Sequence, residues 1–354
     1  MRAVVRQTHP SFSTGVTPQR FQSITAKYPK LRIAVVGDFC LDRYLEIDPE
    51  RTELSIETGS AVHNVVNVRA QPGGAGTILN NLAALGIGHI CPIGFCGDDG
   101  EGFELQRAIS SLPGTSMERF LRTSDRRTFT YCKPLIVEPD RPPRELNRLD
   151  SKNWTPTPAR VEDHLIASIR TVAENVDAII LLDQVDLPET GVLTKRVLDC
   201  VKRIATAKPD FLIVADSRRG LAQYPQVVFK MNAAELVALT GIAPKATIEM
   251  LQQTAAELAR KSRRPVIVTL SEHGIIGATP DGQAAHVPCP PLRGPIDIVG
   301  AGDAVTANVT VARAAGANLP EVLELANAAA SVVIHQLGTT GTASTTQLRE
   351  LLFT

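Results

Sequence analysis

The chain has 354 residues, 44% of them hydrophobic, and 37 lysines and arginines balance 37 aspartates and glutamates. This length allows a large core, as one α/β domain or two, and the composition is that of a globular protein. The balanced charge argues against a nucleic-acid or membrane-surface partner, and no apolar run approaches the length of a transmembrane helix.

Six cysteines are scattered along the chain, at positions 40, 91, 96, 132, 200 and 289, without a CxxC pair. In a chain of this size, that pattern is typical of reduced thiols in a cytoplasmic protein. A metal site built on Cys91 and Cys96 is the alternative interpretation. No Cys or His pair with ligand spacing lies elsewhere in the chain to complete such a site.

Residues 1–29 contain no acidic residue. We expect a loose tail and then a short helix around residues 18–27, ahead of a main domain over residues 30–354. A transit peptide is the alternative, because such peptides are rich in Arg and Ser and poor in acids.

The main domain is predicted to begin with a buried parallel strand, because Leu31–Gly37 is an apolar run that ends in glycine. Asp38 follows at the carboxyl end of that strand, where ligands gather in open α/β sheets, and we expect it to bind a ligand's hydroxyl groups. A turn or cap aspartate is the alternative, and Asp42 is a weaker candidate. Gly37–Cys40 supplies no GxGxxG, which argues against a dinucleotide-binding dehydrogenase.

Two stretches rich in β-branched residues, Leu54–Arg69 and Arg127–Val137, predict strands outside the main sheet. Such strands would form a small separate sheet, approximately within residues 45–70 and 120–150. A basic cluster lies beside the second stretch and would suit a phosphorylated substrate or else form a solvated face: Arg119, Arg122, Arg126, Arg127 and Lys133.

Between these stretches, Gly73–Gly86 is a glycine turn that leads into a helix, followed by a strand at His89–Cys96 and a helix at Gly100–Leu112. Pro134–Pro158 is rich in proline and charge and is typical of a long irregular connection, with a short strand at Arg148–Asp150.

From Ala159 onward, helices and strands alternate at the spacing of βα units, which predicts a parallel sheet with helices on both faces. Asp183 and Asp216 end two of these strands, where ligands gather. The predicted helices are Ala159–Asn175, Thr190–Ala207, Leu319–Leu337 and Thr345–Leu352, and the predicted strands are Asp177–Leu182, Phe211–Ala215 and Arg264–Leu270.

The stretch Ile296–Gly316 carries the strongest chemical signal. It turns at Gly300-Ala301-Gly302 and places Asp303 in the first turn of a helix of small residues. Free N–H groups and the positive end of the helix dipole would form a phosphate-sized anion site there. Asp303 could accept a proton from a hydroxyl that attacks the phosphate. For the GAGD turn alone, a tight loop with an acidic cap is the alternative.

Five pieces of the chain together are similar to the signature regions of the ribokinase-like (pfkB) sugar kinases, and most similar to the kinase module of the heptose-7-phosphate kinases. They occur in the family's order, across roughly residues 30–345: Val36–Tyr44, Pro72–Gly86, Asn232–Glu235, the GAGD turn and Ala326–Thr339.

This resemblance implies a ribokinase-like α/β fold with a central, mostly parallel sheet, helices on both faces and a small β-sheet lid over the sugar. It also implies phosphoryl transfer from ATP to a hydroxyl of a sugar or sugar phosphate, with Mg²⁺. In many relatives the backbone near the GAGD turn holds a monovalent cation, so K⁺ is a further candidate.

The same resemblance assigns roles to single residues. Asp303 is the base, and Gly300, Ala301 and Gly302 form the anion site. Asp38, Gly73, Gly74, Thr77 and Asn81 bind the sugar. The residues that bind ATP are Asn232, Glu235, Thr269, Ser271, Gly274 and Asn327. Glu235 also organises Mg²⁺ through water. Asp297 and Val299 mark the loop that holds the monovalent cation. Two alternatives stay open: a capping box at Asn232 and Glu235, and a satisfied buried amide at Asn327.

Thr77, Gln184 and Ser217 depart from the family pattern, which usually has Asn, Tyr and Pro there. A nucleoside kinase of the same fold and a catalytically silent sugar- or nucleotide-binding regulator therefore remain alternatives. The chain lacks the P-loop motif and the protein-kinase motifs. We expect no adenylyltransferase module after Thr354, and a homodimer formed through the edge of the lid.

Overall fold

The computed structural model describes residues 15–353. Within that span, the central sheet has eight strands in the order β15-β14-β13-β12-β11-β10-β1-β4. All neighbours from β4 to β13 pair in parallel, and β14 and β15 add an antiparallel edge. The predicted mostly parallel sheet is thus confirmed. Its strands are β1 (Arg32–Gly37), β4 (His89–Ile93), β10 (Ala178–Asp183), β11 (Leu212–Ser217), β12 (Val228–Asn232), β13 (Val266–Thr269), β14 (Ile275–Ala278) and β15 (Ala284–Val287).

Helices cover both faces of this sheet. Along β1, Ile33 and Val35 belong to one hydrophobic cluster, and Ala34 and Val36 belong to another, because successive side chains of a strand point to opposite faces. The first cluster includes residues of α2 (Ala75–Ala84), α8 (Ala301–Ala314) and α9 (Leu319–Val333). The second includes residues of α4 (Ala159–Val172), α5 (Lys195–Ala207) and α7 (Ile248–Ser262).

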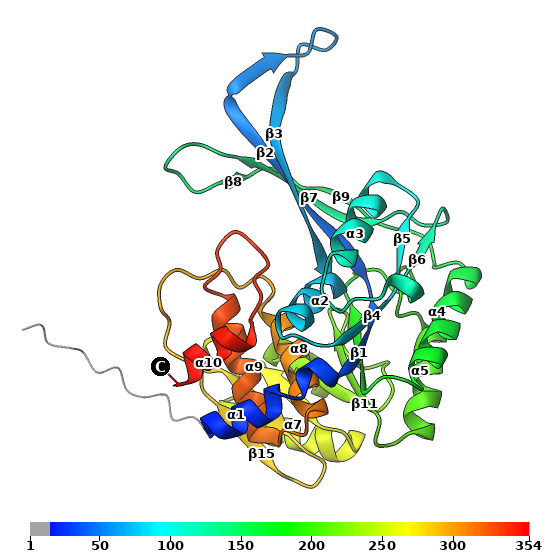
Figure 1. The fold of residues 1–354 in the computed structure, drawn as a ribbon, viewed down its shortest axis with the longest axis vertical. Helices are drawn as coiled ribbons and strands as arrows, with labels where there is room; N and C mark the ends of the chain where they lie inside the picture. The colour runs from blue at the N-terminus through cyan, green and yellow to red at the C-terminus, as the bar shows by residue number, and fades with distance from the viewer. Residues whose placement is uncertain (1–14, 354) are drawn as a thin grey trace, which may run out of the picture.

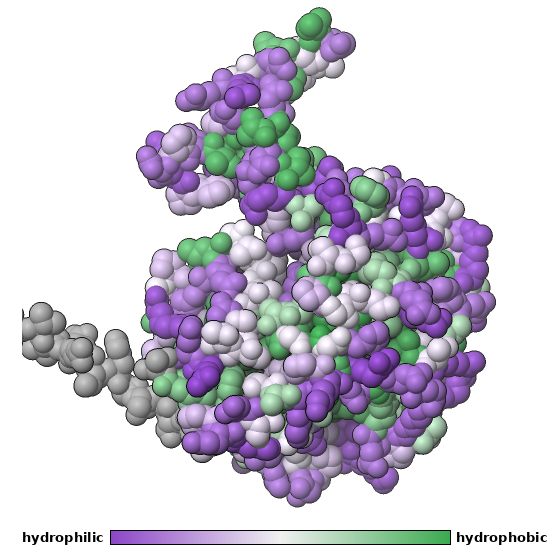
Figure 2. All heavy atoms as spheres, viewed as in Figure 1, coloured by the Kyte–Doolittle hydropathy of each residue, from purple (hydrophilic) through white to green (hydrophobic). Residues whose placement is uncertain are grey.

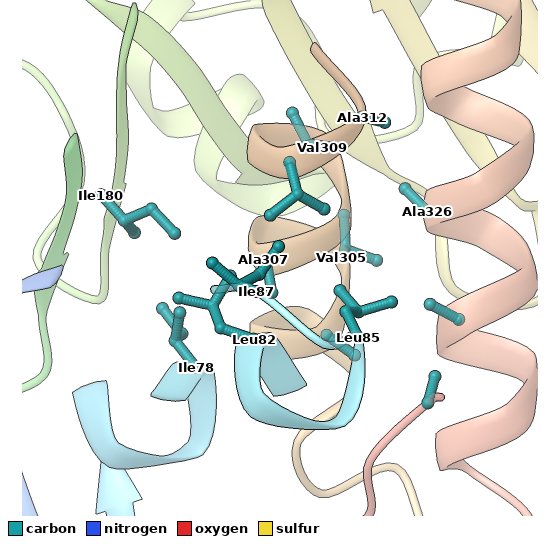
Figure 3. Packing of buried hydrophobic residues seen from close by; sticks show 14 of the residues in the cluster. Ile78, Leu82, Leu85, Ile87, Ile180, Val305, Ala307, Val309, Ala312 and Ala326 are labelled. Atoms are coloured by element: carbon teal, nitrogen blue, oxygen red, sulfur yellow. The ribbon is translucent and has the colours of Figure 1, made fainter. Parts of the chain in front are cut away.

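Figure 3 shows the packing of α2 against α8. Leu82 of α2 lies close to Ala307 of α8, and Ile78 of α2 and Ile180 of β10 belong to the same hydrophobic cluster. The small residues of α8 allow this close approach, and an apolar contact of this density resists movement. The hydrophobic core therefore holds α8, the helix that carries Asp303, in a fixed position.

The lid is a second sheet. Within the described residues, its strand order is β3 (Ala61–Gly74), β2 (Phe39–Leu54), β7 (Phe129–Ile136) and β8 (Arg144–Glu145). Strand β9 (Leu149–Ser151) also pairs with β7. Figure 1 shows the β2–β3 hairpin projecting far from the body. The lid strands begin at Phe39, directly after the first core strand, and so start earlier than the predicted 45–70.

Three predicted elements are corrected by the structure. The strand expected over His89–Cys96 breaks at Gly94, where a Cβ would lie 2.7 Å from the Gly37 carbonyl oxygen, and β5 (Phe95–Gly97) pairs instead with β6 (Leu121–Thr123). β6 therefore lies in the predicted range 120–150 but outside the lid. The helix expected from Thr190 begins at Lys195, and the one expected to end at Leu337 ends at Val333.

The helix expected ahead of the main domain, α1 (Pro18–Thr25), packs against that domain. Arg20 forms an ion pair with Glu321 at 2.7 Å, and the rings of Phe21 and Phe353 meet edge to face. Residues 1–14 of the predicted tail lie outside the described residues. In residues 15–353, the remaining helices are α3 (Gly100–Ser110), α6 (Ala233–Thr240), α10 (Thr345–Phe353) and three short 3₁₀ turns, Tyr28–Lys30, Met117–Arg119 and Ser271–His273.

None of the helices in residues 15–353 has the length and apolar character needed to cross a membrane.

Candidate active site

A cavity of about 480 Å³ lies between the lid and the carboxyl ends of the central strands. The lid contributes Asp42, Tyr131 and Lys133, and the core contributes strand-end acids and the start of α8. This is the end of an open α/β sheet at which ligands bind. The body residues that line the cavity include Gly74, Thr77, Asp183, Gln184, Asp186, Asp216, Arg218, Lys230, Val299, Gly300, Gly302, Asp303 and Thr340.

The GAGD turn forms the N-terminus of α8, as the sequence predicts. Gly300 is the N-cap residue with φ +83°, and a Cβ there would lie 2.6 Å from Cγ2 of Thr340, so both conformation and space require glycine. The N–H of Ala301 donates to the Ile298 carbonyl at 3.3 Å. The orphan donors that remain for an anion are therefore the N–H groups of Gly302 and Asp303, rather than that of Ala301.

Asp303 lies in the first turn of α8 and lines the cavity. Burial, and after it the nearby charge of Asp216, raise the pKa of Asp303 to about 7, although Lys230 and Arg218 act in the opposite direction. A carboxylate whose pKa lies near neutral is suited to accept a proton, because it is deprotonated at working pH yet basic enough to take one.

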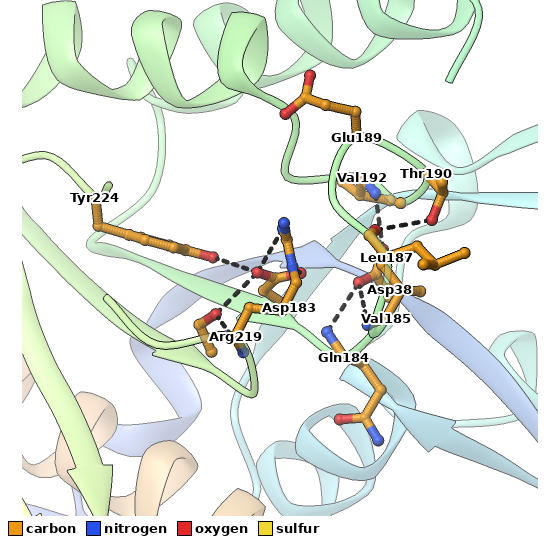
Figure 4. A network of polar contacts seen from close by, with 12 residues as sticks. Asp38, Asp183, Gln184, Val185, Leu187, Glu189, Thr190, Val192, Arg219 and Tyr224 are labelled. Atoms are coloured by element: carbon orange, nitrogen blue, oxygen red, sulfur yellow. Dashed lines mark hydrogen bonds and ion pairs between the residues drawn. The ribbon is translucent and has the colours of Figure 1, made fainter. Parts of the chain in front are cut away.

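Asp38 is completely buried and does not line the cavity. Its Oδ2 accepts hydrogen bonds from the backbone N–H groups of Gln184 (2.8 Å) and Val185 (3.2 Å), and its Oδ1 accepts one from Val192 (2.7 Å). Figure 4 shows these contacts converging on one carboxylate. Asp38 thus takes the cap role that the sequence left open as the alternative, and its contact with a sugar stays a prediction.

This cap also explains why α5 starts five residues later than predicted. Residues 184–192 are drawn into a loop around Asp38, and Thr194 becomes the N-cap of α5 by accepting a hydrogen bond from Val197. Burial, and after it the charge of the neighbouring Asp183, raise the pKa of Asp38 to about 6, although the three backbone donors act in the opposite direction.

Asp183, at the end of β10, lines the cavity and is held by three side chains, as Figure 4 shows in part. Its carboxylate accepts hydrogen bonds from Ser217 Oγ (2.8 Å), Arg219 Nη2 (2.8 Å) and Tyr224 Oη (3.1 Å). The serine that departs from the family pattern at 217 therefore has a local function. It orients Asp183, which a proline there could not do.

The predicted sugar ligands divide into two groups. Gly74 and Thr77 line the cavity. Asn81 is fully buried beneath it, where its Nδ2 donates to the Thr77 carbonyl at 3.0 Å and its Oδ1 accepts from the N–H of Ala343 at 3.3 Å. Gly73 lies outside the lining, and any side chain there would strike the Asp42 carboxylate.

Asp42 is therefore the lid carboxylate that the structure brings into the cavity. It pairs with Lys133 at 3.2 Å, and the Lys133 ammonium also lies 4.8 Å from the centre of the Tyr44 ring. The sequence marks Asp42 only weakly, because it falls inside a strand whose extent depends on pairing with distant segments.

The predicted ATP ligands lie at the carboxyl ends of β12 and β13 and along α9, outside the lining of this cavity. Asn232 and Glu235 form the capping box of α6, so the structural interpretation of that pair is confirmed. Asn327 is buried, and its Nδ2 donates to the Pro288 carbonyl at 2.8 Å, which fits the alternative of a satisfied amide. Ser271 and Gly274 bound the 3₁₀ turn after β13, and the hydroxyl of Thr269 donates to the Met231 carbonyl at 3.4 Å.

Within residues 15–353, no three His, Cys, Asp or Glu side chains are placed to hold a metal ion by themselves. Mg²⁺ in phosphotransferases is usually bound by one or two carboxylates, water and the phosphates of the substrate. Glu235 suits such an outer role, because Oε2 accepts the N–H of Asn232 at 2.7 Å and Oε1 stays available. At the predicted monovalent-cation loop, Asp297 Oδ1 accepts the N–H of Val299 at 3.1 Å.

The predicted basic cluster does not reach the cavity, apart from Lys133. Arg126 is buried and donates to backbone carbonyls, including that of Thr190 at 2.7 Å, while Arg119 and Arg122 pair with neighbouring surface acids. Arg127 donates to Ser151 Oγ at 3.0 Å. The cluster is thus dispersed by local partners that the sequence does not identify.

Other cations line the cavity instead: Lys133, Arg148, Lys152, Arg218 and Lys230. Four of them pair with a carboxylate, namely Lys133 with Asp42, Arg148 with Asp150, Lys152 with Asp186 and Lys230 with Asp216. Arg218 alone has no carboxylate partner among the residues that the structure describes. The sequence signal for Lys230 was a charge inside an otherwise apolar strand, two residues before Asn232.

Residues 150–346 match the model of the pfkB family of carbohydrate kinases. Among curated proteins, the chain is similar to the bifunctional protein HldE of Azorhizobium caulinodans, with 29% identity over 308 residues that cover 87% of this chain. It is similar to HldE of Hyphomonas neptunium as well, with 30% identity over 310 residues and 87% of this chain. The matched region spans 61% of the length of each of these two proteins.

Solved structures share the fold. The ribokinase of Arabidopsis thaliana in complex with ribose and ATP superposes with a TM-score of 0.65 at 20% identity, over 92% of this chain and 99% of that one. Phosphofructokinase-2 of Escherichia coli in complex with potassium gives a TM-score of 0.68 at 16% identity, over 91% of this chain and 98% of that one. These similarities show a ribokinase-like fold.

Proposed function

The chain belongs to the pfkB family of carbohydrate kinases, and we propose that it transfers the γ-phosphoryl group of ATP to a hydroxyl of a sugar or sugar phosphate. The observation that carries this proposal is the position of Asp303, beside the free N–H groups of the α8 N-terminus and in the lining of the cavity. A base and an anion site within one helical turn are the two parts that phosphoryl transfer to an alcohol needs.

In this proposal Asp303 accepts the proton of the attacking hydroxyl. The N–H groups of Gly302 and Asp303 stabilise the negative charge on the phosphoryl oxygens. Gly300 positions these donors, because only a glycine can adopt the N-cap conformation with φ +83° so close to the Thr340 methyl group. Mg²⁺, held partly through Glu235, would neutralise charge on the ATP phosphates.

We infer that the acceptor is bound by the cavity-lining groups Asp42, Gly74 and Thr77, with Asp38 and Asn81 as the scaffold behind them. Thr77 and Gln184, which depart from the family pattern, both line the cavity. They are placed to change which hydroxyls are recognised, while Asp303 and the anion site are intact. This arrangement favours an altered substrate over the catalytically silent regulator.

A phosphorylated acceptor is favoured by Arg218, a cavity-lining guanidinium without a carboxylate partner in the described part of the chain. A phosphate group on the sugar could form bidentate hydrogen bonds with it. Lys152, which also lines the cavity and pairs with Asp186 at 2.9 Å, could add charge. Together with the similarity to HldE, this supports a heptose 7-phosphate as the first acceptor to test.

On the nucleotide side, we assign ATP to the predicted residues at the ends of β12 and β13: Asn232, Glu235, Thr269, Ser271 and Gly274. A K⁺ ion near Asp297 and Val299 remains part of the proposal. We also infer a cytoplasmic enzyme, because the six cysteines are free thiols, five of them buried.

The lid supports a homodimer. Its projecting hairpin exposes large apolar side chains, visible in Figure 2 as hydrophobic atoms above the body. An open sheet edge with apolar side chains can pair with a second copy. The exposed residues of the hairpin are Leu54, Ile56, Val65, Val66 and Val68.

The experiment that tests the function measures ADP formation with Mg²⁺ and K⁺ against a panel of sugars, sugar phosphates and nucleosides. We expect turnover with a heptose or hexose phosphate, and a loss of that turnover in Arg218→Gln through a raised KM. Turnover with a nucleoside alone would replace the proposed substrate class. ATP binding without turnover on any member of the panel would contradict the kinase assignment.

A further inference from the structure

Lys230 is a charged side chain in the interior of the protein, at the anion site. It lies on β12, is 6% exposed, and extends to the start of α8, where a Cβ on Gly302 would lie 3.1 Å from its Nζ. It also lines the cavity. Removing a lysine ammonium from water carries a large desolvation penalty, so a charged partner or a function must offset it.

Asp216 supplies the first partner. Its Oδ2 accepts hydrogen bonds from Lys230 Nζ at 2.7 Å and from Thr306 Oγ1 at 2.9 Å, and the same hydroxyl lies 3.0 Å from the Gly302 carbonyl oxygen. Lys230 is therefore fixed to the first two turns of α8 through Asp216 and Thr306. Burial acts to lower the pKa of Lys230, but Asp216 outweighs it and the pKa lies above its ordinary value, so the ammonium stays charged.

The excess of negative charge around the anion site indicates a second role for Lys230, beyond its ion pair with Asp216. Its ammonium is close enough to Asp216, Asp303 and Glu235 to feel all three negative charges. A phosphoryl group entering at the α8 N-terminus would meet the same three carboxylates, which repel it. The N–H groups at a helix N-terminus supply only about half an elementary charge, which is too little to balance three acids.

We propose that Lys230 is a catalytic residue that donates a hydrogen bond to the transferring phosphoryl group, and that Asp216 and Thr306 position it. This inference rests on the proposed kinase function and deepens it. Asp216 fixes the ammonium beside Gly302 before ATP binds, so little reorganisation is needed when charge develops during transfer.

The competing explanation is that Lys230 only neutralises Asp216. The two explanations differ in a double variant. Lys230→Gln leaves Asp216 as an unpaired buried carboxylate and is expected to lower Tm. Lys230→Gln combined with Asp216→Asn removes both charges and is expected to restore Tm, because a neutral pair can replace a buried ion pair.

The test measures kcat on the best acceptor and, by calorimetry, the Kd of MgATP and of MgADP for both variants. Lys208→Gln is the matched control, since Lys208 pairs with Glu174 at the surface and neither residue lines the cavity. We expect kcat to fall about a hundredfold or more in both Lys230 variants, including the one with restored Tm. We expect MgATP to lose at least about tenfold more affinity than MgADP, because the γ-phosphoryl contact is missing.

Recovery of wild-type kcat in the double variant, or equal weakening of MgATP and MgADP, would overturn the assignment of Lys230. If the wild-type protein binds ATP but phosphorylates no acceptor, the kinase proposal fails. In that case the MgATP and MgADP comparison still decides whether Lys230 contacts the terminal phosphate.

Discussion

The side-chain amide of Gln71 donates a hydrogen bond to the hydroxyl of Thr340 at 2.7 Å. Gln71 lies near the end of lid strand β3, and Thr340 packs against Gly300 at the N-terminus of α8. Gln71 Oε1 also accepts a hydrogen bond from Thr339 Oγ1 at 3.2 Å. The root of the lid is thus joined directly to the segment that borders the anion site.

This link predicts that lid position and phosphoryl transfer are coupled. We expect Gln71→Ala to raise KM for the acceptor and lower kcat by roughly tenfold, because one or two hydrogen bonds of about 1 kcal/mol each are lost. The Kd of ATP should change little. A double-mutant cycle with Thr340→Val measures the coupling, and strictly additive effects on kcat/KM would contradict the link.

The pKa of Asp303 predicts the pH dependence of the reaction. As a base, Asp303 acts only when deprotonated, and burial together with Asp216 raises its pKa to about 7. We therefore expect kcat/KM to be constant above pH 8 and to fall toward a tenfold loss per pH unit below about 7. A profile that stays flat down to pH 5 would exclude Asp303 as the base in the free enzyme.

The same shift predicts an effect on stability. The pKa of Asp303 in the folded protein is above its ordinary value of 3.8, so the folded state binds the proton more tightly and loses stability as pH rises from about 4 to 7. Asp303→Asn should be more stable than wild type at pH 8 by roughly 1–3 kcal/mol, and equally stable at pH 4. Thermal unfolding at both pH values measures this; equal stability at pH 8 would contradict the buried charge.

Substitutions of Asp38 and Asp42 are expected to affect different properties: the first mainly stability, and the second mainly acceptor binding. Asp38→Ala should lower the free energy of unfolding by about 3 kcal/mol or more, because three backbone N–H groups lose their acceptor. Asp42→Asn, at a cavity-lining side chain, should mainly raise KM for the acceptor and lower Tm less than Asp38→Ala does, because Lys133 keeps its hydrogen bond to Tyr44. Denaturant unfolding and steady-state kinetics on both variants separate the two roles, and a pure KM effect in Asp38→Ala would restore it as a substrate ligand.

A side chain added at Gly300 is expected to cause a local packing defect. Gly300→Ala places a Cβ 2.6 Å from Thr340 Cγ2 at a backbone conformation with φ +83°, so we expect a large loss of kcat. Thr340→Ser removes that methyl group and should recover part of the loss in the double variant, leaving about 1–2 kcal/mol of backbone strain. Absence of any rescue would show that the clash is not the cause.

Much of the fold could be predicted, because its elements are local and periodic. The parallel strands are apolar runs followed by polar residues, and the α6 capping box is a four-residue signal. The predictions that were wrong concern elements whose bounds depend on contacts between segments distant in the sequence. Thr190–Val192 reads as the start of a helix, but the Val192 N–H is taken by Asp38, 154 residues away in the sequence.

The site was only partly predictable for the same reason. Asp303, Gly74 and Thr77 belong to short motifs that place them at the cavity. The cations that line it come from four separate segments, and their pairing with Asp42, Asp186 and Asp216 follows from the tertiary fold. A cluster of arginines close together in sequence proved dispersed, because each one found a different local partner.

The most direct test of this account compares wild type and Asp303→Asn in a single-turnover experiment. ADP formation and the Kd of MgATP are measured on the same samples, with an acceptor that the wild type phosphorylates. The account predicts a loss of turnover of at least about a hundredfold with ATP binding within a few-fold of wild type. Turnover in Asp303→Asn close to that of wild type would contradict the role of Asp303 as the base, and with it the central claim.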